Sequence, residues 1–195
     1  LAYTDGESGT GGRNDLLGYG RLNAGRLLGL ARVTVNTGFG GASATADALT
    51  DFFCEPVQAP SLAAQADDYF AFKTWEAAPP GNASIFTPTT AATVAAIYDD
   101  VTLTATFDPM LAPLGTPLYW LAAHGLTTPD FGTAEADDAD TDGHAAWQEW
   151  LAGTDPGDDA SVLRLTAFQR LADGRCVVSW SSVSNRVYDI LAYDS

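Results

Sequence analysis

The chain has 195 residues, enough for one sizeable domain or for two to three small modules. Its 25 acidic and 9 basic residues give a formal net charge of −16, and such a surface repels phosphate backbones, which argues against nucleic acid as a partner. No run of about 18 apolar residues is present, so no membrane span is expected. Divalent cations would complement this charge, although a solvated acidic coat explains it as well.

Residues 1–31 begin with a glycine-rich stretch, and the residues from Leu16 to Leu30 are expected to form a loop and a short helix. Because the chain opens with Leu1 rather than Met, we expect it to be a piece of a longer precursor, with any export signal upstream.

Residues 32–109 are rich in Thr, Ala, Val and Phe, and several segments alternate between apolar and polar residues, which predicts strands. The expected strands are 33–35, 69–72, 93–97 and 101–107. Glycines and prolines punctuate these segments as turns, at Gly38, Gly40, Gly41, 79–81 and Pro88. The pattern predicts a small β module.

Residues 110–160 change character. Thr116 is expected to cap a helix that has Pro117 in its first turn and ends before Gly125. An acidic loop follows. A second short helix, about 145–152, places Trp147, Trp150 and Leu151 on one side and ends at Gly153.

Residues 161–195 return to strand patterns, expected at 162–168, 177–180 and 187–191 with a turn at 172–174. Three or four strands are few for an independent sheet, so this module is either small and docked or truncated. The fold class expected for the whole chain is therefore mainly β with short helices, built from several modules.

The segment from Asp138 to Glu149 carries the clearest chemical signal. It reads Asp-Ala-Asp-Thr-Asp-Gly-His-Ala-Ala-Trp-Gln-Glu, with acids at loop positions 1, 3, 5 and 12 and glycine at 6, which is the pattern of an EF-hand calcium loop. The predicted Ca²⁺ ligands are Asp138, Asp140, Asp142, the carbonyl of His144 and Glu149, and a water would take the place of Ala146 at position 9.

Four carboxylates that share one centre repel each other strongly. At an effective dielectric constant near 20, a like-charged pair about 4 Å apart costs on the order of 4 kcal/mol. We therefore expect the loop to hold a cation or to be disordered. An acidic linker is the alternative interpretation, and the match at five positions before an amphipathic helix argues against it.

The helix at 117–124 ends well before Asp138, so a continuous entering helix is not expected. The site thus resembles dockerins and thrombospondin type 3-like repeats, and the phrase Ala-Gly-Thr-Asp-Pro at 152–156 is typical of such repeats in exported bacterial proteins. Asp155, Asp158 and Asp159 either bind a second ion or form a capping and linker cluster, which their spacing favours. A lone site outside a helix pair does not suit a calcium sensor.

The two cysteines, Cys54 and Cys176, have no metal-ligand spacing and lie far along the chain from both histidines, which argues against zinc. They form either one disulfide in an exported protein or two buried free thiols, and the sequence does not decide between these.

Gly18-Tyr-Gly-Arg-Leu-Asn-Ala24, followed by a helix, resembles the end of the catalytic domain of subtilisin-like serine proteases. An ordinary glycine turn is the alternative. The resemblance implies that the catalytic Asp, His and Ser lie upstream. The family's GTSxxxP motif is absent here, so no residue of this chain inherits a catalytic role.

Residues 32–109 resemble divergent bacterial β-repeats related to the internalin B-repeat. The matching parts are the glycines at 38–41, the aromatic segment ending at Trp75 and the strand at 101–107, with an Ala-rich insertion around 49–66. Such repeats serve as spacers and adhesive stalks. Tyr69, Phe72 and Trp75 are expected in the core rather than on a ligand-binding shelf.

Together these features predict a non-catalytic, calcium-stabilised spacer from the C-terminal part of an extracellular or surface-attached bacterial subtilisin-like protease. Its expected partners are a calcium ion and the upstream catalytic domain of the same precursor. The alternative is a calcium-dependent adhesion or carbohydrate-binding fragment that contacts a cell surface or polysaccharide. The stretch upstream of residue 1 would discriminate between them, because it would hold either a GTSMxxP motif or further β-repeats.

Overall fold

The computed structural model describes residues 28–45, 47–184 and 186–189 and confirms a mainly β fold with three short α-helices in these ranges. The chain divides into two compact units, Leu1–Pro109 and Met110–Ser195. None of the helices among the described residues is long and apolar enough to cross a membrane. The segment that resembles a protease domain, Gly18–Ala24, lies outside the described residues.

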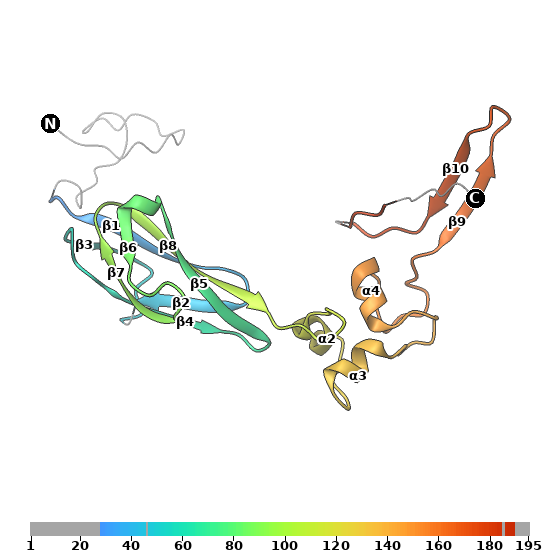
Figure 1. The fold of residues 1–195 in the computed structure, drawn as a ribbon, viewed down its shortest axis with the longest axis horizontal. Helices are drawn as coiled ribbons and strands as arrows, with labels where there is room; N and C mark the ends of the chain where they lie inside the picture. Colours follow the sequence, from blue (N-terminus) through green and yellow to red (C-terminus); the bar gives the residue numbers. More distant parts are fainter. Residues whose placement is uncertain (1–27, 46, 185, 190–195) are drawn as a thin grey trace, which may run out of the picture. The chain divides into compact units, whose positions relative to one another are not determined.

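The described part of the first unit consists of two four-stranded sheets that pack face to face (Figure 1). One sheet has the order β3-β1-β8-β5, with β1 and β8 parallel and the other neighbours antiparallel. The other has the order β2-β4-β7-β6 and is antiparallel throughout. The strands are β1 (Ala31–Thr37), β2 (Gly41–Thr45), β3 (Asp51–Cys54), β4 (Ser61–Ala66), β5 (Phe70–Ala78), β6 (Ala83–Ile85), β7 (Ala92–Ile97) and β8 (Val101–Pro109), and a 3-10 turn, η1 (Pro80–Asn82), precedes β6.

Strict alternation places one side of each central strand in the core. In β8, Val101, Leu103, Ala105 and Phe107 are buried and the residues between them are more exposed, as a strand with one face on the core requires. Trp75 is 2% exposed, and its indole N–H donates to the carbonyl oxygen of Ala91 at 3.3 Å, which satisfies the one polar group of the ring.

The segment 49–66, expected as an insertion in the repeat, contributes two strands to the sandwich: β3 pairs with β1, and β4 pairs with both β2 and β7. Trp75 lies in the core, and the half-buried Phe72 packs against it. Tyr69 is also half-buried, but it lies in the turn before β5 with a φ of 68°.

Both cysteines are free thiols in the structure, and the expectation of a buried thiol holds for Cys54 but not for Cys176. Cys54 is buried at the end of β3, and desolvation raises the pKa of its thiol. Cys176 is exposed at the start of β10 in the second unit.

The second unit contains α2 (Leu118–Ala123), α3 (Phe131–Ala136), α4 (Ala146–Ala152) and an antiparallel hairpin of β9 (Leu165–Arg170) and β10 (Cys176–Trp180) (Figure 1). β9 is shorter than the predicted strand at 162–168 on its N-terminal side. Residues 187–189 are not in a strand, and residues 190–195, which contain the rest of the predicted strand 187–191, lie outside the described part of the chain.

The capping of α2 differs from the expectation at its N-terminal end and agrees with it at its C-terminal end. Pro117, not Thr116, is the N-cap residue, and no side chain caps the helix there. Thr116 is fully buried instead, and its hydroxyl has no hydrogen-bond partner. The C-terminal expectation is confirmed, because Gly125 follows the helix with a φ of 74°.

Gly41 gives a test of the sandwich. A Cβ at this position would lie 2.6 Å from both the carbonyl oxygen of Gln65 and Cε1 of Phe107, whereas a Cβ at Gly81 would meet nothing within 4 Å. Overpacking a well-packed interior costs about 1–3 kcal/mol. We expect Gly41→Ala to lower the free energy of unfolding by that amount in urea denaturation, with Gly81→Ala unchanged. Equal stability of the two variants would contradict the packing described here.

Candidate metal centre

The loop from Asp138 to Glu149 is flanked by helices on both sides, which corrects the expectation that no entering helix is present. The short helix α3 ends at Ala136, and α4 begins at Ala146. The Ala146 N–H donates to the carbonyl oxygen of Asp137 at 3.0 Å, which joins the two ends of the loop. The arrangement is therefore helix–loop–helix.

The entering helix is fixed by two carboxylates that are not metal ligands. Asp130 caps α3 by accepting from the Thr133 backbone N–H at 2.8 Å. Glu135 is fully buried and accepts from the backbone N–H of Leu114 at 2.7 Å and from that of Thr116 at 3.4 Å. Glu135 thus attaches α3 to the turn before α2, and this sets the position from which the loop departs.

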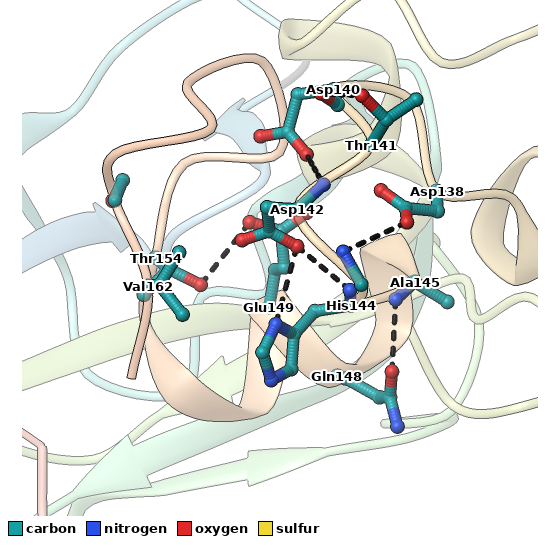
Figure 2. Close-up of polar contacts among 12 residues, drawn as sticks. Asp138, Asp140, Thr141, Asp142, His144, Ala145, Gln148, Glu149, Thr154 and Val162 are labelled. Atoms are coloured by element: carbon teal, nitrogen blue, oxygen red, sulfur yellow. Dashed lines mark hydrogen bonds and ion pairs between the residues drawn. The ribbon is translucent and has the colours of Figure 1, made fainter. Parts of the chain in front are cut away.

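The loop backbone turns its three aspartates toward a common centre. Gly143 has a φ of 98°, a conformation that L side chains rarely adopt, which is the physical reason for glycine at this position. Each aspartate accepts one backbone N–H: Asp138 from Gly143 at 2.9 Å, Asp140 from Asp142 at 3.2 Å, and Asp142 from His144 at 2.7 Å (Figure 2).

The second oxygen of each acid has no hydrogen-bond partner. These buried, unpartnered atoms are Oδ1 of Asp138, Oδ2 of Asp140, Oδ2 of Asp142 and Oε2 of Glu149. Ligand oxygens of the three aspartates lie within 4.8 Å of one another. Buried polar groups are ordinarily satisfied, so four unpartnered carboxylate oxygens in one loop and the helix that follows it require an explanation.

Glu149 is the most buried of the four acids, with 1% of its surface exposed. It lies on α4, and its Oε1 accepts from the Thr154 hydroxyl at 3.2 Å (Figure 2). Desolvation, followed by the charge of Asp140, raises the pKa of the Glu149 carboxyl to about 7; the charge of Asp142 acts in the same direction, and the Thr154 hydrogen bond and His144 oppose it. The fold therefore holds a carboxylate where its charge is costly.

The remaining predicted site residues are His144 and the aspartates that follow α4. His144 follows the aspartates, and its half-exposed ring places Nδ1 3.2 Å from Oδ1 of Asp142. The role of the His144 carbonyl oxygen as a ligand stays a prediction. Asp155 and Asp158 accept the backbone N–H groups of Gly157 and Ala160, the bonding of a turn, and a second ion at these residues stays a prediction.

Sequence reasoning missed α3, Glu135 and Thr154. The signal for α3 was available, because Asp130 after Pro129 is a good N-cap. Leu151 was expected on one side of α4 with Trp147 and Trp150, and it is 64% exposed, whereas the buried residues of α4 are Ala146 and Glu149.

Comparison with models of known protein families, with characterised proteins and with solved structures finds no match to this chain. The interpretation of the loop therefore depends on its own chemistry. The unpartnered oxygens belong to the same four side chains that the loop pattern requires at positions 1, 3, 5 and 12. These donors fit a hard divalent cation.

The raised pKa of Glu149 predicts a pH dependence in protein kept in excess EDTA. The folded pKa of about 7 exceeds the ordinary value of 4.5, so the folded state binds the extra proton between these values. Stability due to this group is therefore present below pH 4.5 and is lost as the pH rises to about 7.

Glu149→Gln removes this titration and keeps an oxygen that can accept from Thr154. In EDTA we expect the two proteins to unfold alike near pH 4 and the variant to be more stable at pH 8, by about 1–3 kcal/mol, because one pKa unit corresponds to about 1.4 kcal/mol. Urea denaturation at each pH measures the difference. If the wild type were more stable than the variant at pH 8, the negative charge of Glu149 would not destabilise the folded state.

Proposed function

We propose that residues 138–149 bind one calcium ion and that this ion stabilises the unit in which they lie. The observation that carries the proposal is the set of four unpartnered, buried carboxylate oxygens, on Asp138, Asp140, Asp142 and Glu149. A cation bound there would supply the partner that each oxygen lacks and offset the repulsion among the four charges.

The donor chemistry favours calcium over other metals. All four side-chain donors are carboxylate oxygens, which suit hard cations, whereas zinc and copper sites use imidazole or thiolate ligands. Magnesium requires near-ideal octahedral geometry and usually keeps several waters, whereas calcium accepts six to eight oxygens in a flexible arrangement. A loop that converges four acids on one centre offers that larger ligand set.

The proposed role of the chain is structural. We propose a non-catalytic, calcium-stabilised spacer or accessory region of an exported bacterial protein. A non-catalytic role is proposed because the GTSxxxP motif of the subtilisin-like family is absent from the sequence of this chain. His144 lies in the proposed metal loop, where its Nδ1 is 3.2 Å from Oδ1 of Asp142. The subtilisin-like parent is proposed from the Gly18–Ala24 resemblance alone.

Calcium should raise the melting temperature of the chain, because a ligand that binds only the folded state adds about 2.7 kcal/mol at one hundred times its Kd. Asp142→Asn keeps the shape of a ligand and removes its charge. We expect this variant to lose most of the calcium-dependent shift in differential scanning calorimetry.

Asp68→Asn is the matched control, because Asp68 is exposed and lies in the first unit, outside the loop. It removes the same charge and should retain the full shift. Limited proteolysis should cut near Asp138 in EDTA and be slowed by calcium. A wild type whose melting and proteolysis are unchanged by calcium would refute the proposed site.

The parent protein is tested separately. A precursor expressed with the coding sequence upstream of residue 1 should hydrolyse peptide substrates and be blocked by a serine-directed phosphonate inhibitor. The chain 1–195 alone should show no turnover in the same assay. An inactive precursor with further β-repeats upstream would instead support the adhesion alternative.

A further inference from the structure

The helix α4 is contacted by groups that belong to different parts of the second unit. Near its middle, Glu149 faces the loop. At its C-terminal end, the carbonyl oxygen of Ala152 accepts from the Tyr188 hydroxyl at 2.9 Å. The same Tyr188 oxygen accepts from the Val183 backbone N–H at 3.0 Å. Tyr188, together with Val183, is therefore attached to the helix that carries a proposed metal ligand.

A second contact joins the same two parts. The guanidinium carbon of Arg186 lies 4.9 Å from the centroid of the Trp150 ring, a cation–π arrangement. The Arg186 side chain also packs against Gly153, where an added Cβ would lie 2.7 Å from Nε. Gly153 ends α4 with a φ of 78°, and because it has no Cβ the Arg186 side chain can pack directly against its backbone.

Residues next to Glu149 in sequence make all of these contacts. Trp150 follows it directly, and its ring centroid lies 5.5 Å from that of Trp120 on α2. The Gly153 and Thr154 backbone N–H groups donate to the Glu149 carbonyl oxygen at 2.6 and 3.1 Å, and the Thr154 hydroxyl donates to its carboxylate. A change in the position of Glu149 must therefore move the surface on which Arg186 and Tyr188 lie.

We infer that calcium binding at the loop and docking of Arg186 and Tyr188 onto α4 stabilise each other, which rests on the proposed calcium site. Calcium fixes Glu149 and with it the end of α4, and the two docked side chains hold α4 in the position from which Glu149 reaches the ion. Coupling between two binding events is reciprocal: calcium favours docking by the same factor by which docking favours calcium binding. Loss of the docked state should therefore weaken calcium binding.

Arg186→Ala and Arg170→Ala test this coupling in the full 195-residue chain. Both remove one positive charge from the C-terminal segment, but Arg170 is exposed on β9, away from α4 in sequence and contact. Loss of a positive charge by itself favours a cation. We expect Arg186→Ala to raise the calcium Kd about fivefold or more in isothermal titration calorimetry, and Arg170→Ala to leave it unchanged or lower it.

Hydrogen exchange provides the converse measurement. Calcium should slow exchange of the Val183 amide, which donates to Tyr188, and the Glu149→Gln variant should show no such slowing. Tyr188→Phe, which removes only the hydroxyl, should raise the calcium Kd in the same direction as Arg186→Ala and serves if that variant does not fold.

The two levels of the proposal fail differently. A wild type that binds no calcium would overturn the proposed site itself. Calcium binding with equal Kd values for the two arginine variants, and with Val183 exchange independent of calcium, would leave the site intact and overturn the coupling.

Discussion

The main physical constraint on the described part of the second unit is the repulsion among the carboxylates of its loop and of α4. Each of Asp138, Asp140 and Asp142 uses one oxygen to accept a backbone N–H, and Glu149 uses one to accept a hydroxyl. These bonds fix the carboxylates in place, but they leave the other oxygens buried and unpartnered. Hydrogen bonds within the loop thus position the carboxylates but do not remove the repulsion among their charges. A cation at the centre is the component that would convert a costly arrangement into a stabilising one.

The two units differ in how they can be stable. The sandwich buries a continuous apolar cluster that draws on both sheets, including Leu62, Trp75, Ile97 and Leu103. The described part of the second unit buries only Ala112, Leu121 and Ala146 in its own cluster. Small cores rarely suffice without a disulfide or a metal, and the cysteines are free. This difference is the reason for placing the proposed stabilising role of the metal in the second unit.

The sequence predicted the elements whose residues have a strong local propensity or a specific spacing, without contacts from distant parts of the chain. β8 alternates strictly between apolar residues and Thr, and the acidic loop has the spacing of a calcium loop. β2 and β4 were missed because Gly-Ala-Ser-Ala-Thr and Ser-Leu-Ala-Ala-Gln-Ala have weak strand propensity, and pairing with neighbouring strands decides their conformation. The six-residue helix α3 contains Gly132 and depends on its Asp130 cap and on Glu135, whose partners lie 19 and 21 residues away.

Glu135 and Glu149 show why the site could be located from the sequence but not understood from it. Both are buried glutamates on short helices, and the loop pattern selects Glu149 without showing how many donors surround either carboxylate. The two oxygens of Glu135 each accept a backbone N–H, so its charge is satisfied by the protein itself. Only one oxygen of Glu149 is satisfied, and the charges of Asp140 and Asp142 lie against it. The number of donors around each carboxylate separates Glu135, which the protein satisfies, from Glu149, which we propose as a metal ligand, and that number is a property of the fold.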